Sequence, residues 1–371
     1  MSRTSTLSVV HLASGDLWAG AEVQLYQLAT ELDLLPDIDV SAVLMNEGLL
    51  AERLRAAGIR VTVLPEGELS SWQILQSLVT LLKATRPAIL HTHRQKENVL
   101  GSLAAKFARV PFSLRTVHGA PEFGASGLRR RVNQWLDRAS AILLQDAVVM
   151  VTQELLTQVG RNYPAAKCHV IANGVAEPRP ATGAEQPYFR RAGKFNLCFA
   201  GRLVPVKRID VYADIARAMN ARSDDRFHFH VFGEGPLEHE LRAQLQRDGI
   251  EDRVSVWGFV DDMPSALAQM DALVMTSDHE GLPMIMLEAM ALGVAVVAHD
   301  VGGMTEVLDN GRCGTLVREH TGDAFANAIV RAHDGGELAR NAARAAARYR
   351  ASYTASECAA QYTVLYRQLA G

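Results

Sequence analysis

The chain is predicted to fold as two α/β domains, each built on a parallel sheet. Short runs rich in Val, Ile, Leu and Ala alternate with longer helical patterns from one end to the other, as expected of right-handed βαβ units. The 371 residues exceed what one ordinary hydrophobic core accommodates. Residues 174–193, with three prolines and little periodicity, interrupt the alternation like a linker.

The alternation predicts the strands of each domain. Before the interruption, strands are expected at 8–12, 40–44, 61–64, 89–91, 113–116, 147–151 and 169–171. After it, they are expected at 196–200, 228–232, 254–256, 272–275, 294–298 and 315–317. We therefore expect two Rossmann-like domains facing each other across a cleft: residues 1–175, a linker at 176–193, and residues 194–353. An amphipathic helix at 354–371 is expected to cross back to the first domain.

Composition narrows the class of protein. Hydrophobic residues make up 48% and charged residues 21% of the chain, as in globular and unlike disordered proteins. The formal net charge of −3 argues against a nucleic-acid partner. Four cysteines without CxxC spacing favour reduced thiols and a cytoplasmic location. No apolar run is long enough for a signal peptide or a membrane span, so neither is expected.

One charged residue, Glu288, lies within the most apolar stretch, GLPMIMLEAMALGVAVVA at 281–298. A buried carboxylate is costly unless it is hydrogen-bonded, so Glu288 requires a partner. Pro283 suits the first turn of a helix and Gly293 its end. Glu280, with seven residues between it and Glu288, is then left in the preceding loop. The two carboxylates are then roughly 10 Å apart. This spacing suits an elongated polar ligand whose phosphate meets the helix N-terminus between them.

Ligands of open parallel sheets bind beyond the carboxyl ends of the strands. After the first strand, Gly20 begins a helix where backbone can approach a phosphate or sugar, although a simple turn is the alternative. After the strand at 196–200, Arg202 and Lys207 fit a diphosphate clamp, with ordinary surface cations as the alternative. After 228–232 comes GEGP, which lacks a third glycine, so dinucleotide-dependent hydride transfer loses its main support.

One histidine, His118, is a candidate site residue. His118 follows a strand and precedes Gly119 where the cleft should open. His91 and His93 are interpreted as satisfied structural residues. There is no HExxH motif, and the Cys and His spacings fit no zinc site, so no metal is predicted.

These motifs together resemble the retaining glycosyltransferases of family 4, which have the two-Rossmann GT-B fold. The resemblance covers nearly the whole chain, and several motifs in order are more specific than any one of them. The matching segments are GAE at 20–22, VHG at 117–119, NGV at 173–175, AGRLVPVK at 200–207, GEGP at 233–236, GFV at 258–260, HEGLPMIMLEAMALG at 279–293 and VGGMTE at 301–306. The chain departs from the usual GGAE motif at Ala19, where a methyl group replaces a hydrogen.

The resemblance implies roles for individual residues. Arg202 and Lys207 would hold the donor diphosphate and stabilise the leaving nucleoside diphosphate, as a metal does in other transferases. Glu280 resembles the first glutamate of the E-x7-E motif, which binds the transferred sugar, and Glu288 the second, which receives the ribose hydroxyls. His118 would bond the donor sugar. The remaining implied donor-site residues are Gly20, Gly201, Gly233, Gly235, Phe259, Gly281, Leu282, Pro283, Gly302 and Gly303.

The family also implies the reaction class. The expected activity is metal-independent, retaining transfer from a nucleotide sugar, UDP-linked or GDP-mannose, to a hydroxyl of a glycan, lipid-linked or small-molecule acceptor. A role in cell-envelope or polysaccharide biosynthesis follows, and no cofactor is expected because the nucleotide sugar is a substrate. Same-face attack is favoured, since no carboxylate of the first domain presents itself as a nucleophile. The alternatives are a GT-B sugar-nucleotide epimerase or hydrolase and a non-catalytic sugar-nucleotide-binding protein.

A basic stretch offers one clue to the acceptor. Arg129, Arg130, Arg131 and Trp135 share a predicted helix, and such residues can hold a protein to the inner face of an anionic membrane carrying a lipid-linked acceptor. The alternative is a solvated helix whose Trp135 and Leu136 pack inward.

Overall fold

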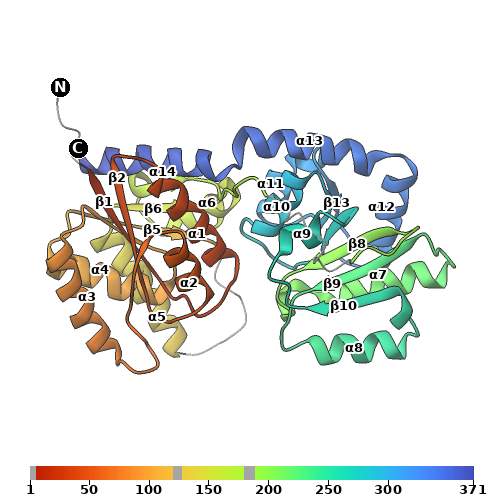
Figure 1. Ribbon diagram of the computed structural model, residues 1–371, viewed down its shortest axis with the longest axis horizontal. Helices are drawn as coiled ribbons and strands as arrows, with labels where there is room; N and C mark the ends of the chain where they lie inside the picture. The colour runs from red at the N-terminus through yellow and green to blue at the C-terminus, as the bar shows by residue number, and fades with distance from the viewer. Residues whose placement is uncertain (1–5, 120–127, 179–188) are drawn as a thin grey trace. The chain divides into compact units, whose positions relative to one another are not determined.

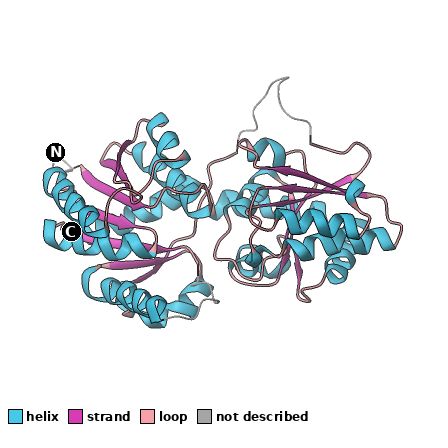
Figure 2. Ribbon diagram, turned by 90° about the horizontal axis from the view of Figure 1, so that it is seen from below, coloured by secondary structure: helices cyan, strands magenta, loops and turns pink. Residues whose placement is uncertain are grey.

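The computed structural model describes residues 6–119, 128–178 and 189–371 and divides the chain into two compact units. The first unit is Met1–Ala176 together with Ala355–Gly371, and the second is Glu177–Thr354. In each unit the strands form a central parallel sheet flanked by helices (Figures 1 and 2). The predicted class of two Rossmann-like domains is therefore confirmed. All four cysteines are free thiols, three of them buried.

The sheet of the first unit has seven strands in the order β3-β2-β1-β4-β5-β6-β7. Each strand coincides with a predicted one to within two residues at either end. The strands are β1 (Leu7–Ala13), β2 (Ile38–Leu44), β3 (Arg60–Val63), β4 (Ile89–Thr92), β5 (Phe112–Val117), β6 (Ala147–Met150) and β7 (Cys168–Val170). The helices are α1 (Gly20–Asp33), α2 (Leu49–Ala56), α3 (Ser71–Thr85), α4 (Gln95–Ala108), α5 (Leu128–Leu144), α6 (Gln153–Val159) and α14 (Ala355–Ala370).

Two hydrophobic cores cover the two faces of this sheet. Because successive side chains of a strand point to opposite faces, Val9 of β1 packs in the core with α1, α2 and α14, and Val10 packs in the core with α3 and α4. The C-terminal helix α14 contributes the buried Tyr362 and Tyr366 to the first of these cores, as its position beside α1 in Figure 1 illustrates. The predicted return of the C-terminal helix to the first domain is confirmed.

The sheet of the second unit has six strands in the order β10-β9-β8-β11-β12-β13. All six predicted strands are present, and a core of buried aromatic residues includes Tyr212, Phe229 and Phe325. The strands are β8 (Phe195–Ala200), β9 (Phe227–Phe232), β10 (Val254–Gly258), β11 (Ala272–Met275), β12 (Ala295–His299) and β13 (Thr315–Val317). The helices are α7 (Ile209–Ala221), α8 (Glu238–Arg247), α9 (Met263–Leu267), α10 (Met284–Leu292), α11 (Gly303–Val307), α12 (Gly322–Asp334) and α13 (Glu337–Ser352).

The strand orders determine where ligands can bind. In each sheet the order reverses once, between β1 and β4 in the first unit and between β8 and β11 in the second. Open α/β sheets bind ligands beyond the carboxyl ends of the strands at such switch points. The loops after β1 and β4, and those after β8 and β11, are therefore where functional side chains of each unit should gather.

Candidate functional site

An ion pair joins the loops after β8 and β11 in the second unit. Lys207 ends a short 3₁₀ helix, Pro205–Lys207, and its Nζ donates to Oε1 of Glu280 over 2.5 Å. Ser277 Oγ donates to the same oxygen over 2.6 Å. The two charged side chains are 24% and 11% exposed, so solvent screens this pair only partly. Two predicted site residues from distant segments thus meet directly.

Backbone contacts hold these two loops together. The N–H of Asp278 donates to the carbonyl of Val206 over 2.8 Å, and Thr276 Oγ1 donates to the carbonyl of Lys207 over 3.0 Å. A hydroxyl and an N–H that satisfy backbone carbonyls in this way restrict the positions that the loops can adopt. The ion pair is consequently held by its surroundings as well as by its own charges.

The predicted glycines Gly302 and Gly303 support Glu280. Gly302 has φ +60°, and a Cβ there would lie 2.2 Å from the carbonyl oxygen of Glu280. The N–H of Gly303 donates to that same oxygen over 3.3 Å. Only glycine combines this backbone conformation with so close an approach. The VGG segment therefore positions the loop that carries the Glu280 carboxylate.

The glycines of the β8 and β9 loops approach each other. A Cβ on Gly233 would lie 2.1 Å from the carbonyl oxygen of Gly201, and one on Gly235 would lie 2.5 Å from that of Leu203. The N–H of Gly201 donates to the carbonyl of Phe232 over 3.0 Å. The family resemblance implied that these glycines belong to the donor site, and the structure shows that their lack of side chains allows the two loops to pack together.

Phe259 follows β10 beside these loops. Its side chain is 52% exposed, and its backbone N–H donates to Oε1 of Glu234 over 3.2 Å. The Glu234 carboxylate thereby connects the GEGP segment to the GFV segment. An exposed aromatic ring at this place is available to stack on a planar group.

Helix α10 carries the second glutamate. It runs from Met284 to Leu292, with Gly293 in the left-handed conformation that ends it and Pro283 directly before it rather than in its first turn. Glu280 lies in the preceding loop and Glu288 about one turn into the helix, as predicted. Gly281, Leu282 and Pro283 connect Glu280 to the start of this helix.

We expected the Glu288 carboxyl to have a hydrogen-bond partner, and this prediction is wrong for the described residues. No described residue hydrogen-bonds it or forms an ion pair with it. Desolvation by the surrounding protein raises the pKa of Glu288 from 4.5 to about 7. An apolar helix that keeps an unpaired carboxyl is destabilised by it. Among the described residues, the half-buried Glu288 carboxyl therefore has no partner.

The second predicted cation, Arg202, differs from Lys207. Its side chain is exposed, and among the described residues it forms no ion pair. The neighbouring Arg208, which the sequence analysis did not single out, has two carboxylate partners, Asp210 at 2.8 Å and Asp278 at 3.1 Å. Arg202 thus keeps its charge unneutralised, whereas Arg208 has a structural role.

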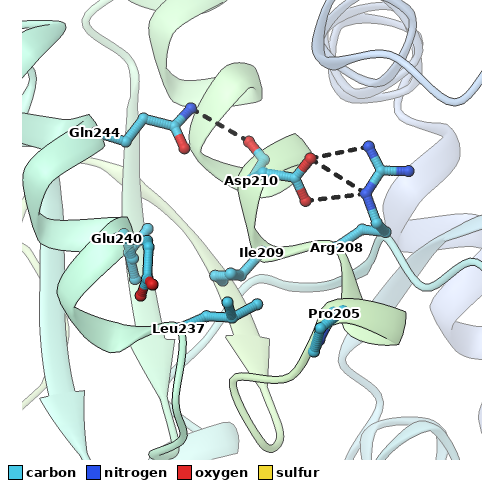
Figure 3. Close-up of a pocket in the computed structure, with 8 residues that line it drawn as sticks. Pro205, Arg208, Ile209, Asp210, Leu237, Glu240 and Gln244 are labelled. Atoms are coloured by element: carbon cyan, nitrogen blue, oxygen red, sulfur yellow. Dashed lines mark hydrogen bonds and ion pairs between the residues drawn. The ribbon is translucent and has the colours of Figure 1, made fainter.

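A pocket of about 260 Å³ lies beside this arginine, between the beginnings of α7 and α8 (Figure 3). Figure 3 shows the Arg208 guanidinium held against the Asp210 carboxylate, with Gln244 donating to the Asp210 carbonyl. Sequence reasoning missed this pocket because its walls come from separate helices. The lining residues are Pro205, Arg208, Ile209, Asp210, Leu237, Glu240, Leu241 and Gln244.

In the first unit an ion pair joins the first turn of α1, the helix after β1, to Arg94 in the loop after β4. Gly20 is the first residue of α1 and is exposed. Two residues later, the buried Glu22 receives Arg94 Nη2 on its Oε1 over 2.5 Å, and its Oε2 has no partner in the described part of the chain. Desolvation raises the pKa of Glu22. Nothing along the sequence links Glu22 to Arg94, so this pair was not predicted.

Four histidines cluster next to this pair. His118 Nε2 lies 3.2 Å from His93 Nδ1, and His93 Nε2 lies 3.0 Å from His11 Nδ1. His91 is bonded separately, to Tyr366 Oη over 2.7 Å and Thr116 Oγ1 over 2.8 Å. The sequence predicted a role for His118 alone. His93 proves to be its direct partner, and His11 was missed because it lies inside a strand.

The ring nitrogens of His11, His91 and His93 lie within 4.8 Å of one another, close enough to raise the question of a metal ion. Both nitrogens of His91 are already hydrogen-bonded. The His91 and His93 rings stack at 4.3 Å between centroids, and the His11 and His93 rings at 5.3 Å. Stacked rings direct their lone pairs along their own planes rather than at a common point, so the cluster does not fit a metal site.

Helix α5 carries the predicted basic stretch. The side chains of Arg129 and Arg130 lie outside the described residues, and Arg131 is exposed. Trp135 is 66% and Leu136 40% exposed, so the alternative in which both pack inward is wrong. None of the helices in the described ranges combines the length and apolar character that crossing a bilayer requires.

Comparisons with known proteins agree with this fold and these motifs. The structure of Anabaena Alr3699/HepE in complex with UDP-glucose matches with a TM-score of 0.83 and 22% identity over 98% of this chain and 100% of that one. The architecture is therefore GT-B. Residues 18–177 match the model described as Glycosyltransferase Family 4, and residues 194–334 match the one described as Glycosyl transferases group 1. The chain belongs to the family 4 glycosyltransferases.

Two curated relatives extend over most of the chain. The Escherichia coli UDP-Gal:alpha-D-GlcNAc-diphosphoundecaprenol alpha-1,3-galactosyltransferase is 27% identical over 90% of this chain and 89% of its own length. The 2-deoxystreptamine N-acetyl-D-glucosaminyltransferase of Streptomyces fradiae is 28% identical over 80% of this chain and 78% of its own. Both names describe glycosyltransferases, but their acceptors differ in kind.

Proposed function

We propose that this glycosyltransferase transfers a sugar from a nucleoside-diphosphate sugar to an acceptor hydroxyl with retention of the anomeric configuration and without a metal ion. The observation that carries this proposal is the ion pair between Lys207 and Glu280 at the start of α10, with the unpaired carboxyl of Glu288 further along the same helix. In such a donor the diphosphate links the sugar to the ribose, so a cation for the diphosphate and one carboxyl for each of the two sugar rings supply a partner for every part.

The cations would stabilise the leaving group. Lys207 Nζ has three N–H donors, of which one is directed at Glu280. The others have no acceptor among the described residues and can bind phosphate oxygens. Arg202, exposed after β8, would add a forked guanidinium. Positive charge preorganised where the diphosphate gains negative charge lowers the barrier for transfer. In this proposal the two side chains replace the divalent cation of metal-dependent transferases.

The carboxyls would bind hydroxyl groups. Glu280 Oε1 is taken by Lys207 and Ser277, and its other oxygen can accept from the transferred sugar. Glu288 would accept from the ribose hydroxyls, which supply the partners that the protein does not. Hydrogen bonds to the ionised form lower the pKa of a carboxyl, so nucleotide binding would return Glu288 to the carboxylate.

The proposed step proceeds on one face of the sugar. The bond between the anomeric carbon and the phosphate oxygen breaks, the acceptor oxygen bonds to the same face of that carbon, and the acceptor proton passes to the departing phosphate oxygen. In the first unit, Glu22 is held by Arg94 and buried, which disfavours it as a covalent nucleophile. His118 would bond a hydroxyl of the donor sugar, and Gly20 would let the α1 backbone approach the diphosphate.

We further propose a UDP-sugar donor and a lipid-linked acceptor of cell-envelope polysaccharide synthesis. The E. coli relative, by its name, uses UDP-galactose and a diphosphoundecaprenol acceptor. The exposed Arg131, Trp135 and Leu136 on α5 are compatible with contact to an anionic membrane surface, where such an acceptor resides.

The test combines binding with product analysis. Thermal stabilisation by UDP, GDP and ADP sugars identifies the donor, because a ligand that binds the native state raises the unfolding temperature. The stabilising donor is then incubated with a lipid-diphosphate-linked sugar acceptor, and NMR of the product reports the anomeric configuration. An inverted linkage contradicts the mechanism. Donor breakdown or epimerisation independent of acceptor indicates an epimerase or hydrolase, and binding of donor without turnover of it indicates a non-catalytic protein.

A further inference from the structure

A chain of three histidines leads from the interior of the first unit to the candidate sugar-binding residue. It consists of His11 on β1, His93 after β4 and His118 after β5, joined by contacts of 3.0 and 3.2 Å. His11 and His93 are 0% and 5% exposed, and His118 is half-buried. At the two ends of the chain, His11 Nε2 and His118 Nδ1 are buried nitrogen atoms without a hydrogen-bond partner in the described structure.

All three rings are neutral at physiological pH. Burial lowers the pKa of His11 to about 3 and that of His118 to about 4, and it lowers the pKa of His93 well below its ordinary value. Nearby positive charges, Arg94 and Arg115, lower the pKa of His118 further. A neutral imidazole has one N–H and one lone pair. Three protons are therefore shared among the six nitrogens of the chain.

Two continuous arrangements satisfy both internal hydrogen bonds. In the first, every Nε2 carries the proton, so that His118 donates to His93 and His93 donates to His11. In the second, every Nδ1 carries it, so that His11 donates to His93 and His93 donates to His118. The arrangements differ at the ends, because the first leaves a buried N–H on His11 and the second places the unpartnered N–H on His118.

The place of the unpartnered N–H decides between the two arrangements, and a ligand adds to the preference. Buried N–H groups without a partner are rarer than buried acceptors without one. The described protein offers the His11 end no partner, whereas a ligand oxygen at His118 would satisfy the N–H there. The second arrangement is favoured already in the free protein, because its unpartnered N–H lies on the half-buried His118 rather than on the fully buried His11. A bound ligand strengthens the preference, since only a lone pair of His11 then remains unsatisfied.

We propose that His93 and His11 are positioning residues for the transfer reaction: they fix the Nδ1–H tautomer of His118, which thereby donates a hydrogen bond to an oxygen of the bound sugar donor. The assignment rests on the proposed function for the ligand, and on the geometry of the chain for the tautomer. The hydrogen bond made by one ring nitrogen determines the state of the other. His91 is excluded from this role, since its nitrogens bond Tyr366 and Thr116.

The direct test is the tautomer of His118. Protein labelled with ¹⁵N in histidine is examined by long-range ¹H–¹⁵N NMR, and the His118 signals are assigned through their loss in His118→Gln. The expected wild-type result is a protonated Nδ1 and an unprotonated Nε2. In His93→Phe, which removes the donor to Nε2, His118 should become a mixture of tautomers. A protonated Nε2 in the wild type, or an unchanged tautomer in His93→Phe, overturns the proposal.

Further variants distinguish a specific change in the His118 tautomer from a general disturbance of the fold. His93→Gln can accept from His11 and donate to His118, so it should restore the Nδ1–H tautomer, and His11→Phe should weaken the preference. The matched control is His91→Gln, which alters a buried ring stacked on His93 but outside the chain. It should reduce stability and leave the His118 tautomer unchanged; a changed tautomer there would contradict the assignment.

Kinetics and donor addition test two parts of the proposal separately: the effect of His93 on the reaction and the contact between His118 and the donor. His93→Phe should lower kcat about tenfold, the lower end of the loss seen when a metal-bound histidine loses its orienting hydrogen-bond partner, and His93→Gln should recover most of it. When a donor that stabilises the protein is added, the His118 Nδ1–H resonance should shift; an unchanged resonance refutes the ligand contact. If no nucleotide sugar binds at all, the proposed function fails, and the apo NMR result still decides the tautomer.

Discussion

Lys207 Nζ and Glu280 Oε1 lie 2.5 Å apart although 73 positions separate the two residues. Their pairing directs the lysine ammonium toward the N-terminus of α10, where the helix dipole also favours an anion. The carboxylate that pairs with Lys207 belongs to Glu280, the residue expected to bind the transferred sugar. Binding of a diphosphate would therefore rearrange the contacts of the existing Lys207–Glu280 pair and would not require a new cation site.

Replacing Lys207 with alanine should lower the rate of sugar transfer by about 10²–10³-fold, because one preorganised positive charge at the diphosphate is lost. The melting temperature should change little, since Ser277 still bonds Glu280. Lys194→Ala is the control, as it removes a lysine paired with Asp225 at 3.1 Å in the same unit. Steady-state kinetics with equal losses in both variants would contradict a specific role for Lys207.

Arg202→Ala should also reduce transfer strongly, and here stability should be unaffected. The Arg202 side chain is exposed and forms no ion pair among the described residues, so its removal disrupts nothing in the fold. Arg208→Ala offers the contrast, because it breaks pairs with Asp210 and Asp278 and should lower the melting temperature. Wild-type turnover in Arg202→Ala would remove this residue from the diphosphate clamp.

Glu288→Gln should stabilise the free protein at alkaline pH. The folded-state pKa of Glu288 is raised from 4.5 to about 7, so the wild type loses stability as pH rises between these values, while the unfolded chain ionises first. Below pH 4.5 the variant and wild type should be equally stable. Above pH 7 the glutamine variant should gain about 2 kcal/mol, less than the full shift implies because the group is partly exposed. Urea unfolding across this pH range measures the difference.

The same substitution should weaken nucleotide binding about tenfold, because hydrogen bonds from ribose hydroxyls to a charged carboxylate are lost. Calorimetry with the nucleoside diphosphate measures this change. If Glu288→Gln is more stable than the wild type but binds the nucleotide more weakly, the Glu288 carboxyl contributes to ligand binding at the expense of stability. Unchanged affinity would show that Glu288 does not contact the ribose.

Gly302→Ala should destabilise the protein and impair transfer together, because a Cβ there would lie 2.2 Å from the Glu280 carbonyl oxygen. Gly249→Ala is the control for a positive φ: its φ of +64° is close to the +60° of Gly302, which also has ψ −155°, and nothing lies within 4 Å of the added Cβ. The control carries only the cost of the left-handed backbone, about 1–2 kcal/mol. If chemical unfolding gives equal losses for both variants, the contact with Glu280 is not the cause.

Sugar transfer should persist in EDTA, because the proposal assigns the charge of the leaving diphosphate to Lys207 and Arg202. Turnover is measured after dialysis against the chelator and again after addition of magnesium. Activity lost in EDTA and restored by magnesium would require a divalent cation in the mechanism. Equal rates in both conditions support the two-cation clamp.

Much of the fold could be predicted because its signals are local. A buried strand is a short apolar run wherever it occurs, so β11 was predicted at its observed boundaries, Ala272–Met275. The helix between Glu280 and Gly293 could be placed from a proline and a glycine, since both restrict the backbone at their own positions. Pro283 nevertheless lies just before the helix, because helix ends depend on contacts that neighbouring segments make.

The partners of the functional side chains depend on the tertiary structure. The sequence alone determined that Lys207, Glu280 and His118 follow strands and that Glu288 lies in a helix. The strand orders β8–β11 and β1–β4 decided which side chains meet. That is why the pairing of Lys207 with Glu280, of Glu22 with Arg94, and of His118 with His93 and His11 was not foreseen. Periodicity is a property of neighbouring residues, but hydrogen bonds and ion pairs form between side chains that only the packing of distant segments brings within reach.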